Sequence, residues 1–204
     1  MNLKRLVLSL MLTAGLCLAA LATPASQAEQ ALSQLQALQK QLSAIPAGGK
    51  PSTKLLAAHK NEIVFSEPSG QWLVRAEAFW KLRDRFAKDP AAERIAWAAA
   101  TQPLPGECEA DACCHLSLEK LTDGRYLELY PAGRHATEAL ERMSKLLTML
   151  TNDTQGVFEY PRETPDVAEM HHTITYLRRV VAGAAPSMRQ RVLQQLDKVS
   201  SRVP

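Results

Sequence analysis

The chain lacks the short motifs that identify many enzymes. It contains no G-x-S-x-G, H-E-x-x-H, P-loop or dinucleotide-binding glycine motif. It also lacks a strong net charge, because 24 lysine and arginine residues stand against 21 aspartate and glutamate residues. Nucleic-acid-binding and polybasic membrane-binding surfaces need concentrated positive charge, so we expect no nucleic-acid partner and no electrostatic attachment to a membrane.

The first 28 residues are typical of a cleavable secretory signal. Two basic residues precede an uncharged apolar run at positions 6–22, and small side chains follow at positions 26 and 28. This pattern predicts cleavage after Ala28, so that the mature chain starts at Glu29. A cut after Ala22 is the alternative, since Ala20 and Ala22 are both small, but it would leave Pro24 just past the site.

Cleavage would place the protein in the periplasm or outside the cell, where disulfides form. It would remove Cys17 and leave 22 basic against 21 acidic residues, a net charge of about +1. The rival interpretation is an uncleaved anchor, but the apolar run is shorter than the ~20 residues of a spanning helix and no charged stop follows it. We therefore expect no stable membrane anchor after cleavage.

Apolar periodicity divides the remaining chain into helical segments. We predict an N-terminal amphipathic helix at 29–45, which packs on its own domain or on a partner, a linker at 46–53 and an all-helical domain at 54–204. The only strand-like run, EIVFS at 62–66, is too short to form a sheet alone. Apolar residues then recur at helical spacing over 72–86, 95–99, 116–130, 136–150, 167–181 and 188–199.

Capping residues followed by proline mark helix starts at Asp89-Pro90 and Thr164-Pro165, and Asp111 is placed to start another helix. Pro131 and Gly133 predict a tight turn between two helices. The fold class is therefore all-α. We expect an irregular bundle or a stack of antiparallel helical hairpins with one intradomain disulfide.

Three cysteines remain after cleavage, in the run PGECEADACCH. A disulfide between the neighbours Cys113 and Cys114 is disfavoured by geometry. Cys114 shares a helical stripe with Leu118 and Leu121, which predicts a buried, reduced thiol. The sequence therefore predicts a Cys108–Cys113 disulfide that holds the proline-rich loop against the start of the next helix.

Two other functions of this run are possible. Cys-X4-Cys-Cys-His could bind a soft metal through the thiolates and His115, or the thiols could exchange disulfides, but the C-x-x-C pairs typical of both are missing. We predict no metal and no cofactor. Glu107, Glu109 and Asp111 form an acidic group that could bind a cation or a basic partner, although helix N-termini favour acidic residues in any case.

The run YLELYPAGRHATEAL at 126–140 resembles the helix-turn-helix junction of tetratricopeptide-like repeats in bacterial envelope-assembly proteins. The resemblance covers about 40 residues around one junction, and no second copy follows at a ~34-residue period. It implies close packing of successive helices and a concave protein-binding face, with Tyr126 and Tyr130 as candidate binding residues. The residues that match are Tyr130, Pro131, Gly133, Ala136 and Leu140.

These observations predict an exported, non-enzymatic domain that binds another protein. It would be either an envelope-assembly adaptor or an inhibitor of the immunity-protein type. The alternative is a periplasmic hydrolase that uses His135 or His172 with acidic residues. A deep pocket that gathers histidine and carboxylates would favour the hydrolase, and a groove or a flat apolar patch would favour the binding protein.

Overall fold

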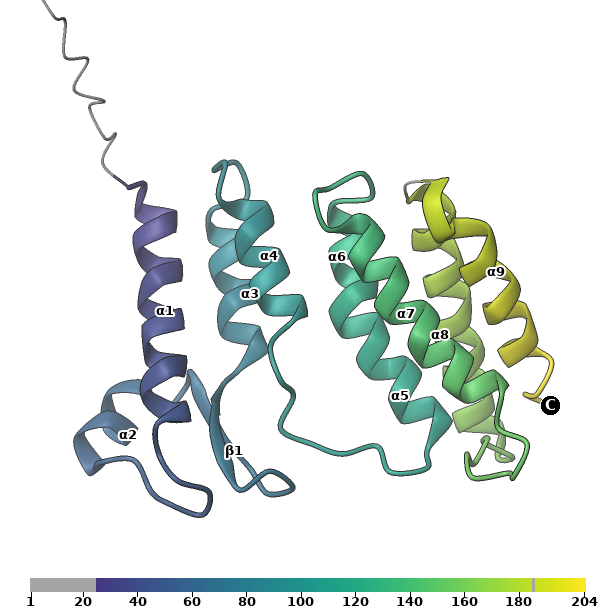
Figure 1. Ribbon diagram of the computed structural model, residues 1–204, viewed down its shortest axis with the longest axis horizontal. Coiled ribbons are helices and arrows are strands. Elements are labelled where there is room, and N and C mark those ends of the chain that lie inside the picture. The colour runs from purple at the N-terminus through teal and green to yellow at the C-terminus, as the bar shows by residue number, and fades with distance from the viewer. Residues whose placement is uncertain (1–24, 185) are drawn as a thin grey trace, which may run out of the picture.

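The computed structural model describes residues 25–184 and 186–204, so most of the predicted signal, 1–24, lies outside the described residues. The described chain is mostly helical and contains one two-stranded sheet (Figure 1). None of its described helices is long and apolar enough to cross a bilayer. The elements are α1 (Gln27–Ser43), α2 (Thr53–His59), β1 (Ile63–Ser66), β2 (Gln71–Val74), α3 (Ala76–Arg85), α4 (Ala92–Ala100), α5 (Ala112–Glu119), the π-helical turn η1 (Lys120–Gly124), α6 (Arg125–Leu129), α7 (Ala136–Thr151), α8 (Thr164–Gly183) and α9 (Pro186–Ser200).

The helices lie in a row that follows the order of the chain. α1 contacts β2 and α3, α3 pairs with α4, and α4 reaches η1 and α6. α7 then packs on α9, and α8 packs on α5 and α9 (Figure 1). The turns that join α3 to α4, α6 to α7 and α8 to α9 all lie at the same end, the top of Figure 1.

The β-hairpin corrects the predicted helix at 72–86, which begins only at Ala76. β1 and β2 are antiparallel, with Ile63 opposite Val74, and Gly70 gives the connecting turn a φ of +64°. The sequence does not distinguish the second strand, because QWLV continues the apolar spacing of α3. Trp72 instead packs against Phe65 on the opposite strand, with ring centroids 5.3 Å apart and the rings tilted by 50°.

α1 packs against its own domain through one apolar stripe. Its neighbouring side chain Gln39 accepts the Val74 N–H at 2.8 Å, which ties the helix to the hairpin. The loop predicted as a linker is also held, because the Gly48 N–H donates to the Gly70 carbonyl at 2.7 Å and the Trp72 indole donates to the Gly49 carbonyl at 3.1 Å. The stripe consists of Ala28, Leu32, Leu35, Leu38 and Leu42, all buried.

α5, η1 and α6 form one continuous helical segment with a π-turn at its centre. A π-turn inserts an extra residue into the helical repeat and so rotates the following side chains. Asp123 is buried as a result, whereas Leu121 is 55% exposed. The predicted buried stripe through Leu121 is therefore wrong.

The α6–α7 turn packs so tightly that it needs glycine. A Cβ atom at Gly133 would lie 2.6 Å from Glu93 Oε1, 2.7 Å from the Tyr126 hydroxyl and 2.8 Å from Tyr130 Cβ. The close approach brings the α6–α7 turn against Glu93 of α4. Gly133 is one of the residues that match the predicted helix-turn-helix junction. Close packing, and not an unusual backbone angle, explains why glycine is needed there.

We expect Gly133→Ala to lower the free energy of unfolding by about 1–3 kcal/mol, as overpacked sites do. Gly183→Ala is the control, because a Cβ there meets nothing within 4 Å and alanine favours the helix end. Urea unfolding of both variants measures the difference. Equal stability of the two would contradict the close approach of the turn to α4.

Candidate functional site

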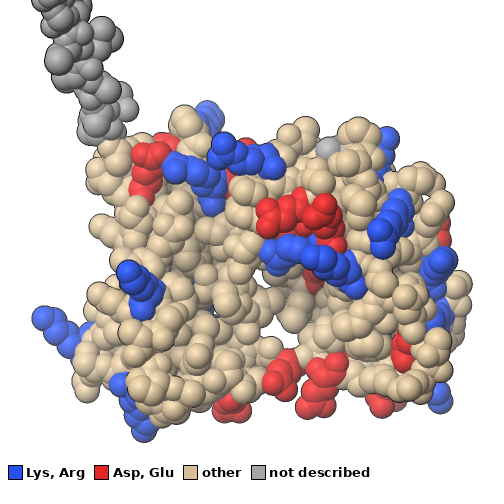
Figure 2. All heavy atoms as spheres, viewed as in Figure 1, with Lys and Arg blue, Asp and Glu red and all other residues tan. Residues whose placement is uncertain are grey.

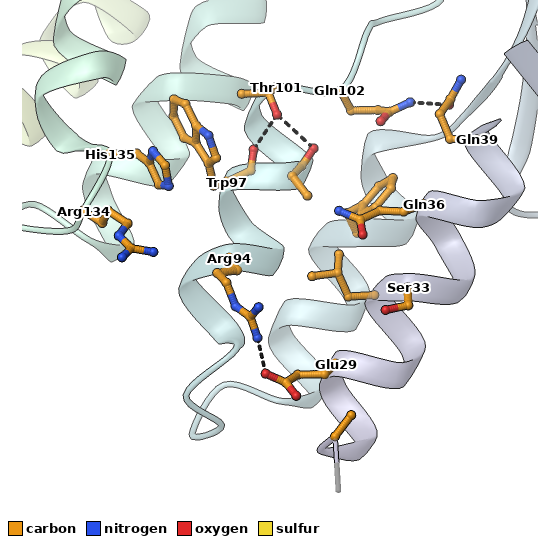
Figure 3. Close-up of a pocket in the computed structure, with 14 residues that line it drawn as sticks. Glu29, Ser33, Gln36, Gln39, Arg94, Trp97, Thr101, Gln102, Arg134 and His135 are labelled. Atoms are coloured by element: carbon orange, nitrogen blue, oxygen red, sulfur yellow. Dashed lines mark hydrogen bonds and ion pairs between the residues drawn. The ribbon is translucent and has the colours of Figure 1, made fainter. Parts of the chain in front are cut away.

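A groove of about 660 Å³ runs between α1, α4 and the α6–α7 turn (Figure 3). We call it the α1–α4 groove. Residues from α1 recur on one helix face at spacings of three and four, and residues from α4 do the same on the facing helix, so each helix lines the groove with one stripe. The groove is lined by Glu29, Leu32, Ser33, Gln36 and Gln39 of α1, Arg94, Trp97, Ala98, Thr101 and Gln102 of the α4 side, and Ala25, Phe79, Arg134 and His135.

Polar contacts between the two helices close the groove at both ends. Arg94 forms an ion pair with Glu29 at one end, and the Gln102 amide donates to Gln39 Oε1 at 2.6 Å at the other (Figure 3). Because each contact joins a residue of α1 to one on the α4 side, the two contacts fix the spacing of the groove walls.

The groove combines an apolar floor with free polar groups on its walls. Leu32 and Phe79 are buried at the base. Ser33 and Gln36 are exposed, and their side chains make no hydrogen bond within the described part of the chain. Such a surface can bind both the apolar and the hydrogen-bonding groups of a ligand.

Trp97 and His135 form the third wall. Their rings are stacked, with centroids 4.4 Å apart and an interplanar angle of 2°. The buried Tyr126 supports them, since its ring packs edge-on to Trp97 at 5.1 Å and its hydroxyl accepts the His135 N–H at 3.1 Å. The same hydroxyl donates to Glu93 Oε1 at 2.7 Å. Burial and the neighbouring Glu93 together raise the pKa of Tyr126, so it stays a neutral donor.

The two tyrosines predicted to bind a partner contact other side chains of the fold instead of lining the groove. Tyr126 is fully buried behind the groove wall. Tyr130 accepts a hydrogen bond from Arg83 Nε at 3.1 Å and carries the Arg83 guanidinium over its ring. Neither residue lines the α1–α4 groove, but Tyr126 orients the residues that do.

Behind the groove lies a buried acidic pair that the sequence did not reveal. Glu119 and Asp123 stand one helical turn apart, at 8% and 1% exposure. Arg142 Nε lies 3.1 Å from Asp123 Oδ2, an ion pair without the alignment of a hydrogen bond. Burial raises the pKa of Asp123 to about 7 although Arg142 lowers it, and burial together with the nearby Asp123 raises the pKa of Glu119 well above its usual value.

Arg142 connects this acidic pair to the groove wall. Its guanidinium lies over the Trp97 ring, 5.6 Å from the centroid, and its Nη2 donates to the Ala100 carbonyl at 3.2 Å. The acidic pair was missed because an i, i+4 pair of carboxylates usually marks a solvated helix face, and only the π-turn rotates Asp123 inward. No local sequence signal announces that turn.

The disulfide joins Cys108 to Cys114, which corrects the predicted Cys108–Cys113 pair. Asp111 caps α5 by accepting the N–H groups of Cys113 and Cys114. The buried stripe of α5 is Ala112, Leu116 and Glu119, so Cys114 lies off that stripe and faces the preceding loop. Cys113 keeps a free, half-buried thiol. Its pKa is raised by burial and by the nearby Asp111 and other carboxylates.

The predicted acidic group is only partly assembled. Glu107 and Glu109 are exposed on the loop, and Asp111 is engaged as the α5 cap. Asp111 lies instead near carboxylates that are distant in sequence. A second cavity, of about 500 Å³, is lined by Asp111, Cys113, Cys114, Ser117, Glu159, Tyr160, Pro161, Asp166 and Glu169. Acidic side chains gather along the lower edge of Figure 2, where Figure 1 places the loops before α5 and α8.

The two histidines proposed for a hydrolase lie apart in the fold. His135 precedes α7, with Nδ1 3.2 Å from Glu138 Oε2, and His172 is exposed on α8. His115 contacts the Glu109 carbonyl through Nε2. Among residues 25–184 and 186–204, no group of three or more histidine, cysteine, aspartate or glutamate side chains is arranged to hold a metal ion.

Comparison with protein-family models, curated proteins and solved structures finds no match to this chain. The function is therefore argued from the groove and the groups behind it.

We expect Glu119→Gln to flatten the pH dependence of stability. A carboxyl group whose pKa is raised on folding binds its proton more tightly in the folded chain, so its stabilising contribution is complete below about pH 4 and is lost as the pH rises toward the folded-state pKa, which is about 7 for Asp123. Glutamine stays neutral and similar in shape. At pH 8, the free energy of unfolding of the variant should therefore exceed that of the wild type by about 1–2 kcal/mol.

Urea unfolding at pH 5, 6.5 and 8 measures this dependence. Glu141→Gln is the control, because Glu141 is exposed on α7, and it should leave the pH slope as in wild type. An unchanged slope in Glu119→Gln would contradict a buried proton-binding pair.

Peptide mapping of thiol-blocked, non-reduced protein should recover Cys108 linked to Cys114 and Cys113 carrying the blocking group. Because the raised pKa keeps the Cys113 thiol protonated at neutral pH, its alkylation should be slow in the folded protein and fast after denaturation. A Cys108–Cys113 peptide would restore the pairing predicted from the sequence.

Proposed function

We propose that this protein is exported and acts without catalysis, by binding an extended segment of a partner protein in the α1–α4 groove. The observation that supports this most directly is the composition of the groove. Free hydroxyl and amide groups at Ser33 and Gln36 stand above the apolar floor of Leu32 and Phe79. A peptide offers the same combination, with main-chain hydrogen-bonding groups and apolar side chains.

The length of the groove fits a short peptide. Ten residues of α1 separate Glu29 from Gln39, which at 1.5 Å per residue gives a length of roughly 15 Å. An extended chain rises about 3.3 Å per residue, so the groove accommodates four or five residues of the partner.

The charges on the rim favour an acidic residue in that segment. Arg94 is already paired with Glu29. Arg134 is exposed at the α6–α7 turn and forms no ion pair with any described residue. Its guanidinium is therefore available to a carboxylate of the bound segment.

The arrangement of helices supports an adaptor. Three successive helix pairs turn at the same end, which suits a stack of antiparallel hairpins with tetratricopeptide-like packing (Figure 1). The groove also suits an inhibitor of another exported protein, because inhibition needs only a segment of the target. The hydrolase is less well supported, since His135 lies flat against Trp97 at the edge of an open groove.

Two exposed glutamines on α1 provide a matched test. Gln36 lines the groove, whereas Gln41 lies on α1 outside it. A peptide is first selected from a random displayed library against the mature protein. Its affinity should fall by about tenfold or more for Gln36→Trp and change by less than about twofold for Gln41→Trp, because only a tryptophan at position 36 would fill the groove. Fluorescence anisotropy with the labelled peptide measures both.

The same peptide tests the charge preference. We expect it to carry an acidic residue and to bind Arg134→Ala several-fold more weakly, with a reduced dependence on salt. Failure to select any peptide, or equal weakening by both tryptophan variants, would contradict binding in the groove.

A further inference from the structure

α1 begins inside the segment that the sequence assigns to the signal peptide. Ser26 caps the helix, because its hydroxyl accepts the Glu29 N–H at 3.2 Å and the Glu29 carboxylate accepts the Ser26 N–H at 3.3 Å. This reciprocal capping box satisfies two backbone groups that the helix itself leaves unpaired. Ala28 in the first turn is 0% exposed. Residues 26–28 are therefore part of the fold.

The same residues contact other elements of the domain. The Ser26 hydroxyl lies 3.4 Å from Asp89 Oδ1 in the α3–α4 turn, and Gln30 donates its side-chain amide to the Ala25 carbonyl at 3.0 Å. The Glu29 carboxylate bonds both Ser26 and Arg94. One capped helix end thus forms the end of the α1–α4 groove.

We propose that the signal is removed after Ala22, so that the mature protein begins at Thr23. This inference rests on the proposed export, though not on binding in the groove. Both bonds follow a small-x-small triplet, Ala20-Leu21-Ala22 and Ser26-Gln27-Ala28, so the capped helix start decides between them. A cut after Ala22 leaves Ala25 and every residue that caps α1 in the mature chain.

Cleavage after Ala28 would instead damage the helix start. It would remove the Ser26 cap and the buried Ala28 methyl group, and it would place a new ammonium group on Glu29. That charge would lie at the positive end of the helix dipole and near Arg94, where positive charge is unfavourable.

The reaction is hydrolysis of one amide bond by a membrane-bound signal peptidase. Water adds across the Ala22–Thr23 bond, the carboxyl group remains on Ala22 and the amino group on Thr23. No oxidant, reductant or further reactant is needed.

Intact-mass analysis of the full chain, expressed in a Gram-negative host and released by osmotic shock, identifies the first residue. We expect the mass of residues 23–204 with one disulfide. The mass of residues 29–204, or an unprocessed chain in the membrane fraction, would overturn the proposal. A full-length chain in the cytoplasm would contradict export as well, whereas groove binding is measured separately on purified protein.

Two substitutions in the signal sharpen the result. Ala22→Leu should abolish the product that begins at Thr23, because a bulky side chain does not fit the position before the cut. Leu21→Phe, at the tolerant middle position, should leave processing as in wild type. Normal processing of Ala22→Leu would place the cut elsewhere and overturn the proposal.

The thermal stability of two purified chains tests the structural argument independently. Residues 23–204 should melt about 2–6 °C higher than residues 29–204, as expected for loss of an N-cap and a buried methyl group in a domain of this size. Equal melting temperatures would show that residues 25–28 do not stabilise the fold, which removes the structural reason for the earlier cut.

Discussion

The position of Arg142 holds the centre of the molecule together. This side chain of α7 lies against the Asp123 carboxylate of η1, the Ala100 carbonyl at the end of α4 and the face of Trp97. Asp123 is buried, whereas the Arg142 side chain is 37% exposed, so solvent weakens the ion pair and the three contacts stabilise the packing together. The relative placement of α4 and α7, and hence of the groove wall, depends on this side chain.

The π-turn in the helix places the acidic pair beneath Arg142. A regular α-helix would keep the apolar Leu121 nearer the inward face, whereas the observed turn exposes Leu121 and buries Asp123. Burying two carboxylates beside one guanidinium is unfavourable unless a proton neutralises one of them, and their raised pKa values are consistent with that. π-turns recur at functional sites, and here the turn positions Asp123, which lies against Arg142 behind the Trp97 wall of the α1–α4 groove.

Much of the fold follows from local patterns, and the site follows from long-range contacts. The starts of α5 and α7 were predictable because Asp111 caps one and the Pro131–Gly133 turn precedes the other. Apolar periodicity did not predict β2, because Trp72 fits both a strand and the helical spacing that continues into α3. The Cys108–Cys114 pair, the buried Asp123 and the α1–α4 groove all depend on which helix face turns inward. For Asp123, that choice is made by a π-turn that has no sequence signature.

The N-terminal helix connects the proposed processing with the proposed binding. α1 supplies one complete wall of the groove, and its first turn is fixed by Ser26 and by the Glu29–Arg94 ion pair. Isolated helices of this length are marginally stable in water, so α1 depends on its cap and on the stripe that ends at Leu42. A chain shortened at its start would fray next to Arg94, at the end of the groove opposite Gln102. The residues that complete the cap therefore also determine whether the groove has two defined ends.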